Sequence, residues 1–208
     1  MFEIRHCTQA ACGLRFPMDP EINLGAYCPR CGSHLIRVEE PYQTPQAGVE
    51  ARPKRKISVL LDNIRSAYNV GAIFRSADGV GAEHMYLCGI TPNPQENPAV
   101  QKTALGAEAA LVWSAHPNAV VLGQKLCSQG SYLIALETTP HSVPIFSVDN
   151  QLLDKGPMIL VVGNEQAGVD PGLLPLCDLV LALPMLGSKT SLNAAVAFGV
   201  AAYWLAFI

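Results

Sequence analysis

From Ile57 onwards, short apolar runs alternate with segments of helical periodicity, and this alternation constrains the fold more than any other feature. Buried strands are expected at Ile57–Leu61, Met85–Cys88, Tyr132–Leu136, Met158–Val162 and Leu179–Leu183. Strands separated by helices are typical of an α/β domain with a largely parallel sheet. Ligands of such sheets bind at the carboxyl ends of the strands, so the sequence predicts a site there.

Four cysteines lie close together in the N-terminal region, in a Cys-x4-Cys pair and a Cys-x2-Cys pair separated by fifteen residues. Zinc takes four thiolates in a tetrahedron, and the second pair is typical of a zinc knuckle. Residues 1–40 are therefore predicted to form a zinc ribbon, in which the metal stabilises a segment too small for its own core. The expected ligands are Cys7, Cys12, Cys28 and Cys31, with His6 and His34 as alternatives.

Residues 41–56 contain three prolines, one glycine and several charges, and they are interpreted as a linker to a second domain at residues 57–208. Residues 1–56 hold eight Lys/Arg and six Asp/Glu, a net charge of +2. Residues 57–208 hold six and eleven, a net charge of −5. A polyanion would meet positive potential mainly in the N-terminal module and at residues 52–56, unless that basic run is only a solvated linker.

The composition indicates a globular chain, because half of the 208 residues are apolar and 15% are charged. The first residues lack the apolar core of a secretory signal, and seven cysteines are an odd number for a disulfide set. A cytosolic location is therefore expected. No membrane partner is expected, since the apolar C-terminal run is shorter than the roughly 20 residues that cross a bilayer.

The C-terminal stretch combines a loop at Pro184–Thr190 with the most apolar helix of the chain. Proline, glycine and serine leave the loop backbone able to approach a ligand closely. Ser191 is expected to cap the helix. Burial against a second protomer is favoured for its apolar face, which makes a homodimer the expected state. The positions of that face are Leu192, Val196, Val200, Tyr203 and Phe207.

A second helix is expected after the first strand, with Asn69 as its cap and Gly81 at its end. Gly71 and Arg75 lie four residues apart, so the glycine is expected to leave room for the guanidinium. Arginine is suited to holding phosphate, although an arginine on a helix surface needs no such role.

The segment Gly163-Asn-Glu-Gln-Ala-Gly168 directly follows a buried strand, and Asp170 and Pro171 are expected to open a helix after it. Glycines at a strand end permit a ligand to approach closely. Glu165 is interpreted as a residue that binds a cation, accepts a proton, or only adds charge to the loop. No G-x-G-x-x-G, Walker or G-x-S-x-G pattern is present in the sequence, so dinucleotide, NTP and hydrolase functions are not indicated.

Three segments together resemble the SpoU (TrmH-type) branch of the SPOUT RNA methyltransferases. They are Asn69-x-Gly-Ala-Ile-x-Arg75-Ser-Ala, Gly163-Asn-Glu165-x-x-Gly168 and Leu183-Pro-Met185-x-Gly-x-x-x-Ser191-Leu192-Asn193-x-x-Val-Ala197. The resemblance covers residues 57–208 in order and spacing. Ala195 departs from it, because the family often has serine there.

The resemblance implies a SPOUT-type parallel sheet with a C-terminal trefoil knot, a homodimer, and methyl transfer from S-adenosylmethionine to a ribose 2′-hydroxyl of tRNA or rRNA. The implied cofactor-binding residues are Leu136, Gly163, Leu183, Met185, Ser191 and Leu192. The implied catalytic residues are Asn69, Arg75, Glu165, Ser191 and Asn193.

An arginine with a pKa above about 12 is a poor base, so Arg75 is expected to hold phosphate and polarise the hydroxyl. A non-catalytic RNA-binding protein that retains the fold is the alternative, and a small-molecule methyltransferase is a further one.

Overall fold

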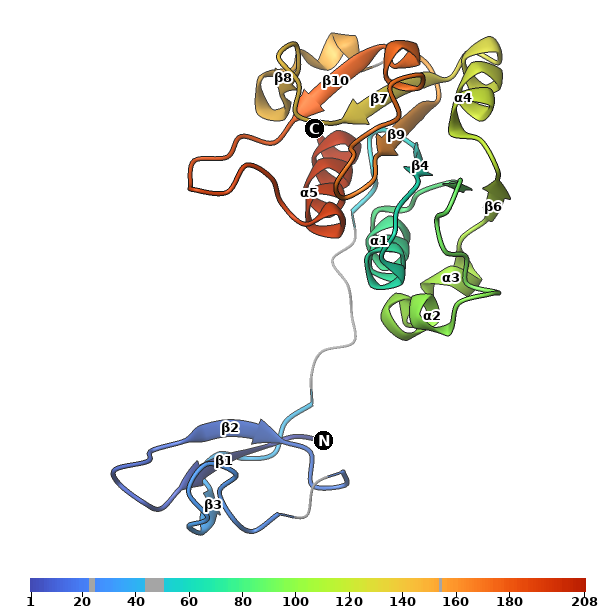
Figure 1. Cartoon of the computed structure of the whole chain (residues 1–208). Helices are drawn as coiled ribbons and strands as arrows, with labels where there is room; N and C mark the ends of the chain where they lie inside the picture. The colour runs from blue at the N-terminus through green and yellow to red at the C-terminus, as the bar shows by residue number, and fades with distance from the viewer. Residues whose placement is uncertain (23–24, 44–50, 154) are drawn as a thin grey trace. The chain divides into compact units, whose positions relative to one another are not determined.

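The computed structural model describes residues 1–22, 25–43, 51–153 and 155–208, and its contacts divide into two compact units, Met1–Ala51 and Arg52–Ile208 (Figure 1). Residues 44–50, in the middle of the expected linker, lie outside the described residues. The main-chain N–H groups of Lys54 and Arg55 donate to Ala206 O at 2.7 and 3.3 Å. The basic run at residues 52–56 therefore belongs with the larger unit.

The larger unit contains one seven-stranded sheet in the order β6-β5-β4-β9-β7-β10-β8, in which every recorded pairing is parallel. This confirms the expected parallel α/β sheet, and all five predicted strands are present within one residue at each end. Two strands at the edges, β6 and β8, escaped the sequence analysis because they are short and incompletely buried. The strands are β4 Ile57–Asp62, β5 Met85–Cys88, β6 Trp113–His116, β7 Tyr132–Leu136, β8 Val143–Pro144, β9 Met158–Val162 and β10 Leu179–Ala182.

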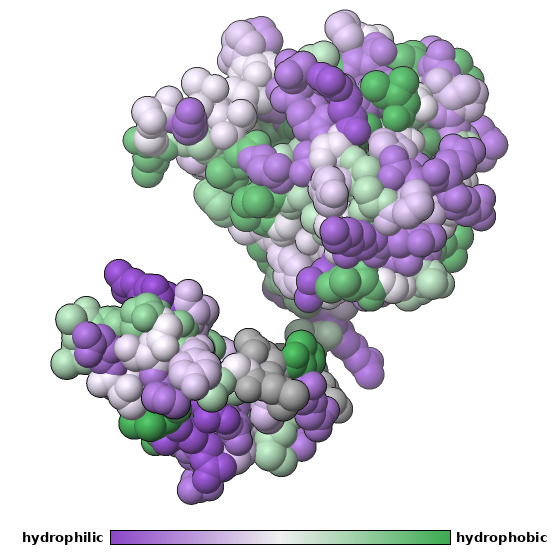
Figure 2. Space-filling view, turned by 60° about the horizontal axis from the view of Figure 1, so that its bottom comes forward, coloured by the Kyte–Doolittle hydropathy of each residue, from purple (hydrophilic) through white to green (hydrophobic). Residues whose placement is uncertain are grey.

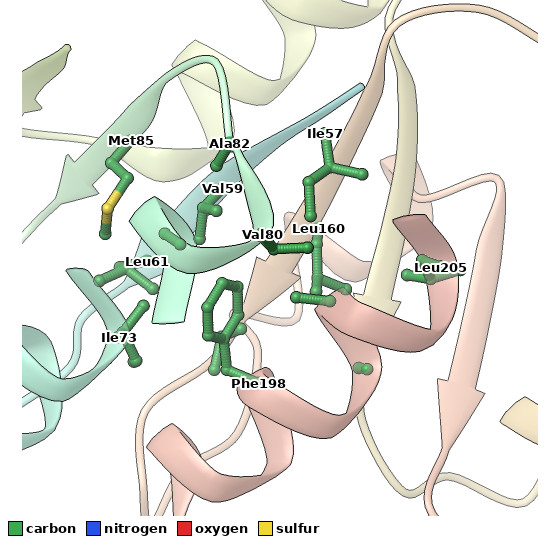
Figure 3. Packing of buried hydrophobic residues seen from close by; sticks show 14 of the residues in the cluster. Ile57, Val59, Leu61, Ile73, Val80, Ala82, Met85, Leu160, Phe198 and Leu205 are labelled. Atoms are coloured by element: carbon green, nitrogen blue, oxygen red, sulfur yellow. The ribbon is translucent and has the colours of Figure 1, made fainter. Parts of the chain in front are cut away.

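Helices cover both faces of the sheet, which is why the central strands are apolar throughout. Side chains of β4 and β9 such as Val59 and Leu160 pack with Phe198 and Leu205 of the C-terminal helix (Figure 3). Leu60 and Val161 point to the opposite face, where they pack with α4. The remaining helices are α1 Ala67–Val80, α2 Pro98–Ala104, α3 Ala107–Ala110, α4 Ala119–Ser128 and α5 Ala194–Phe207, with 3₁₀ turns at Ile145–Ser147, Asn150–Leu152 and Leu174–Leu176.

Helix α1 begins one turn earlier than expected. Ser66, not Asn69, is its N-cap, and the Ser66 hydroxyl accepts a hydrogen bond from Asn69 N. Gly81 ends the helix with a φ of 73°, as predicted. The space beside Gly71 is not available to Arg75, because a Cβ there would lie 2.0 Å from Thr103 Oγ1 of α2. Gly71 thus allows α2 to pack closely on α1.

The cap predicted for α5 was wrong, while the burial of its predicted face against a second protomer stays a prediction. Asn193 caps the helix in place of Ser191, and its side chain accepts hydrogen bonds from Ala195 N and Val196 N. The predicted face is largely exposed: Val196 is 53% and Tyr203 46% accessible. Since α5 is apolar on nearly every side, periodicity did not distinguish the face that packs on the sheet. The buried residues are Phe198, Ala201, Ala202, Leu205 and Ala206.

The helix predicted at Asp170 and Pro171 is also absent. Asp170 Oδ1 accepts a hydrogen bond from Gly172 N, and a turn leads into the short 3₁₀ helix at Leu174–Leu176. Among the described residues, no helix combines the length and the hydropathy that crossing a membrane requires. The trefoil knot stays a prediction of the resemblance.

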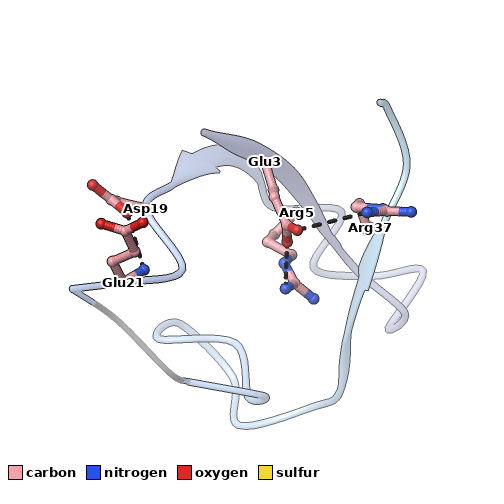
Figure 4. A network of polar contacts seen from close by, with 5 residues as sticks. All are labelled: Glu3, Arg5, Asp19, Glu21 and Arg37. Carbon is pink, nitrogen blue, oxygen red and sulfur yellow. Dashed lines mark hydrogen bonds and ion pairs between the residues drawn. The ribbon is translucent and has the colours of Figure 1, made fainter. Parts of the chain in front are cut away.

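The smaller unit is a three-stranded antiparallel sheet in the order β2-β1-β3, formed by Arg15–Met18, Glu3–Cys7 and Leu35–Arg37. Glu3 bridges Arg5 of its own strand and Arg37 of β3 (Figure 4). Among the described residues of this unit, the apolar cluster has three buried members, Cys7, Cys28 and Leu35, so packing alone stabilises it little.

Candidate active site

The carboxyl ends of β7, β9 and β10 surround a cavity of about 240 Å³. The cavity lies at the strand ends, where the sequence predicted a site. The six residues expected to bind the cofactor all line it: Leu136, Gly163, Leu183, Met185, Ser191 and Leu192. The walls thus combine apolar side chains with exposed main chain and polar side chains such as Glu165 and Thr190, which suits a ligand with both apolar and polar groups.

Several residues that the motifs did not single out also line the cavity. Glu137 and Thr138 follow β7 directly, and Gln166 belongs to the turn after β9. Their position at strand ends was the available signal. Ala194 lines the cavity from the first turn of α5.

Glu137 holds the turn after β9 against the end of β7. Its Oε2 accepts a hydrogen bond from Val169 N at 3.0 Å, and its Oε1 accepts one from Thr138 N at 2.9 Å. Gly168 has a φ of 75°, and a Cβ there would lie 2.4 Å from Glu137 Oε2. Glycine at position 168 is therefore required both by the backbone conformation and by the carboxylate beside it.

Glu165 joins the same turn to the N-terminus of α1. Its carboxylate accepts hydrogen bonds from Arg65 N at 2.9 Å, from Ser66 N at 3.0 Å and from Asn69 Nδ2 at 2.9 Å. Two segments almost one hundred residues apart in sequence are held together in this way.

Burial raises the pKa of Glu165, but the hydrogen bonds from Arg65 N and Asn69 Nδ2 outweigh it, so the net pKa lies below its ordinary value. Glu165 is thus ionised at neutral pH and already bonded to three donors. Of the three roles considered from the sequence, that of a proton acceptor is disfavoured. Glu165 instead acts as a clamp, which here means that its carboxylate holds the turn after β9 to the start of α1.

Asn69 is hydrogen-bonded in turn to Asn193, the N-cap of α5. Asn193 Nδ2 donates to Asn69 Oδ1 at 3.0 Å, while Asn193 Oδ1 accepts from the first amides of α5. The donor and acceptor of each hydrogen bond in this series are fixed. A carboxylate can only accept, so the side-chain NH₂ group of Asn69 faces Glu165 and its oxygen faces Asn193. All three motif segments of the sequence are linked through these side chains.

Arg75 is not brought into the cavity. Its side chain is exposed on α1 and does not line the cavity of its own chain. Within the described residues it makes no hydrogen bond or ion pair. Its role therefore stays a prediction.

The four N-terminal cysteines converge, as their spacing predicted. The Sγ atoms of all four lie within 4.8 Å of one another, with Cys7 and Cys31 at 3.4 Å and Cys12 and Cys28 at 3.8 Å. Thiolates about 2.3 Å from a tetrahedral zinc ion are roughly 3.8 Å apart, so this donor set fits zinc.

Replacing Glu165 by Gln is expected to weaken binding of S-adenosylmethionine about tenfold at neutral pH, because an amide offers one acceptor oxygen in place of two. The difference from the wild type should stay constant as the pH is lowered to about 4.5, the ordinary pKa of the carboxyl group. It should vanish as the pH falls through the lower native pKa, where the wild-type clamp is itself protonated.

Calorimetric titration of both proteins across this pH range measures the effect. Glu83→Gln is a suitable control, because Glu83 pairs with Lys56 away from the cavity. Equal affinities for wild type and Glu165→Gln would contradict the clamp.

Comparison with known proteins places these features in a family. The chain is 32% identical over 145 residues to the 23S rRNA (guanosine-2'-O-)-methyltransferase RlmB of Pseudomonas syringae, covering 68% of this chain and 54% of that protein. It is 30% identical over 155 residues to the tRNA (guanosine(18)-2'-O)-methyltransferase of Aquifex aeolicus, covering 74% of this chain and 70% of that protein. The chain thus spans little more than half of the first relative.

Solved structures share the fold of the larger unit. The AdoMet-bound rRNA methyltransferase from Sinorhizobium meliloti superposes with a TM-score of 0.64 at 27% identity, over 74% of this chain and 57% of that one. AviRb from Streptomyces viridochromogenes in complex with AdoMet gives a TM-score of 0.61 at 25% identity, over 90% of this chain and 71% of that one.

The profile of one family matches residues 56–203, which contain the cavity, the Glu165 clamp and all three motif segments. The chain therefore belongs to the SpoU rRNA Methylase family.

Proposed function

We propose that this protein transfers a methyl group from S-adenosylmethionine to a ribose 2′-hydroxyl of rRNA or tRNA. The observation that carries the proposal is the cavity at the strand ends, which the second and third motif segments line and Glu165, Asn69 and Asn193 join to α1. Relatives named as rRNA and tRNA 2′-O-methyltransferases support the substrate class.

The chemistry requires two groups to be aligned and one proton to be removed. Bound S-adenosylmethionine supplies an electrophilic methyl group. The main chain at Gly163, Leu183 and Leu192 would hold this donor, and Ser191 lies on the same cavity wall. Asn69 and Asn193 hold the N-termini of α1 and α5 together, and the ribose would lie beside them. Arg75 would hold the RNA phosphate and polarise the hydroxyl.

The alternative is an RNA-binding protein that retains the fold and has lost methyl transfer. The presence of all four polar motif residues, Asn69, Arg75, Glu165 and Asn193, argues against it. Measuring donor binding together with transfer of labelled methyl to unmodified RNA separates the two functions.

Arg75→Ala is expected to lower methyl transfer at least about a hundredfold, because one electrostatic contact to the reacting centre is lost. Binding of S-adenosylmethionine should be unchanged, since Arg75 does not line the cavity of its own chain. Single-turnover transfer of labelled methyl and calorimetry give the two values. Near-normal transfer by the variant would remove Arg75 from the mechanism.

A homodimer is the second part of the proposal. Leu192, Val196, Val200 and Tyr203 are 41 to 53% accessible on one side of α5, although all are apolar or aromatic. Figure 2 shows a group of hydrophobic residues, in green, at the left of the larger unit, with further green areas elsewhere on its surface. Apolar residues that are exposed along one side of a helix are typical of an interface between protomers.

Arg75 lies close to that face. Gly79, one turn further along α1, approaches Tyr203 so closely that a Cβ there would lie 2.8 Å from the Tyr203 hydroxyl. Leu192 both lines the cavity and is exposed with that face, so a second protomer on the α5 face would bring its own cavity close to the interface and to Arg75. We accordingly propose that Arg75 serves the cavity of the partner.

Val200→Asp is expected to yield a monomer, because a carboxylate at the centre of the interface would be buried without a partner. The monomer should bind S-adenosylmethionine, whose cavity lies within one chain, but transfer little methyl. Sedimentation velocity, calorimetry and a transfer assay measure the three properties. A monomeric variant with full transfer activity would contradict the role of Arg75 across the interface.

We also propose that residues 1–40 are a separate ribbon domain that binds one zinc ion through its four cysteines, and that residues 57–208 are the methyltransferase domain. The acidic balance of residues 57–208 supports a contribution of the ribbon and of residues 52–56 to RNA binding. A cytoplasmic location fits this proposal, because RNA substrates and reduced thiolates occur together there.

Elemental analysis of the purified protein is expected to give about one zinc ion per chain, as a four-cysteine site requires. Cys28→Ser should lower that ratio and expose the smaller unit to proteolysis, while binding of S-adenosylmethionine is retained. Cys88→Ser is the matched control, since Cys88 is a buried thiol of the larger unit. Unchanged zinc content in Cys28→Ser would contradict the site.

A further inference from the structure

Arg65 stands beside the cavity and belongs to none of the motif segments. Its main-chain N–H is fixed by Glu165 Oε2 at 2.9 Å, directly before the N-cap of α1. Its guanidinium is exposed, and Nη1 donates to Gln166 Oε1 at 2.8 Å. Gln166 in turn lines the cavity.

The guanidinium of Arg65 has N–H donors left to bind a further ligand. Arginine carries five N–H donors, and here one of them is directed at a neutral amide oxygen. Within the described part of the chain, Arg65 forms no ion pair. A hydrogen bond from arginine to an anionic acceptor is stronger than one to a neutral acceptor. An anion that reaches the Arg65 guanidinium would therefore displace the amide oxygen of Gln166.

Positive charge is scarce in this part of the protein. Residues 57–208 contain six Lys/Arg against eleven Asp/Glu. Arg65 is the one of these six cations whose hydrogen bond, among the described residues, goes to a side chain lining the cavity. Lys125, for example, lies in the last turn of α4, and Lys155 lies over the ring of Tyr132.

We propose that Arg65 makes a phosphate contact in addition to that of Arg75: it binds the phosphate on the 3′ side of the target ribose, releasing Gln166 as it does so. This inference rests on the proposed function. The 3′ phosphate is attached to the carbon adjacent to the one that carries the 2′-hydroxyl, so a hydroxyl that enters the cavity brings this phosphate to its rim. The planar guanidinium suits two phosphate oxygens at once, and its rigid main-chain anchor keeps it in place.

The test measures equilibrium binding of the full-length protein to an unmodified ribosomal RNA transcript by filter retention, over a series of salt concentrations. Loss of one phosphate contact lowers the slope of log affinity against log salt by about 0.7 to 0.9. Arg65→Ala is expected to show this loss together with weaker binding. Arg65→Lys should keep the slope, because the charge remains.

Two further variants separate phosphate binding from a structural role. Gln166→Ala removes the resting partner of Arg65 and should leave the slope unchanged, whereas an equal loss in both variants would overturn the inference in favour of a simple Arg65–Gln166 lock. Lys125→Ala should match the wild type. Calorimetry with S-adenosylmethionine should give the same affinity for Arg65→Ala and wild type.

RNA binding and methyl transfer are measured separately, so the two proposals fail in different ways. A wild-type slope in Arg65→Ala refutes the role of Arg65 even if the protein methylates RNA. Absence of methyl transfer by the wild type, with a reduced slope in Arg65→Ala, refutes the proposed catalysis and supports the phosphate contact.

Discussion

The hydrogen bonds that Glu165 accepts from the start of α1 are the interaction on which the site depends. The turn after β9 has few apolar side chains of its own, so it needs polar contacts to stay in one conformation. Glu165 of the turn accepts them from the start of α1, and Glu137 at the end of β7 accepts one from Val169 N. Both carboxylates bond main-chain N–H groups, which leaves the turn fixed on two sides while the cavity stays open.

These hydrogen bonds also explain why each of the three motif segments carries one polar residue, Asn69, Glu165 or Asn193, that contacts another segment. Asn69 can accept from Asn193 only because Glu165 takes its N–H group. Asn193 can cap α5 only because its own amide group is oriented by Asn69. Changing the carboxylate would therefore disturb the N-termini of both helices, although neither helix contains it.

Elsewhere in the protein, stability has different origins. The sheet of the larger unit is buried between two apolar layers, and α1 and α2 approach closely at Gly71. The smaller unit has a much smaller apolar cluster, in which two of the three buried residues are cysteines of the predicted metal site. A metal-dependent ribbon beside a self-sufficient α/β domain is consistent with this contrast.

Sequence patterns alone predicted the parallel sheet, the five main strands and the convergence of four cysteines, whereas the six residues that line the cavity came from the resemblance to the family. The sheet and its strand ends follow from local rules: continuous apolar runs make buried strands, and parallel strands end at one edge. The cap of α1 was misplaced because Ser66 and Asn69 are both good capping residues, and only the fold selects between them.

Tertiary structure decided the rest. An almost wholly apolar α5 has no periodic signal, so its packing on the sheet determined that Phe198 is buried and Val196 exposed. The partners of Glu165 and Arg65 lie on segments distant in sequence, and no local pattern specifies such a pairing. The sequence by itself thus determined which segments form strands and that their carboxyl ends lie at one edge of the sheet, because both depend on patterns of residues close together in the chain. The hydrogen bonds between those strand ends and the helices depend on how the packed elements are placed in space.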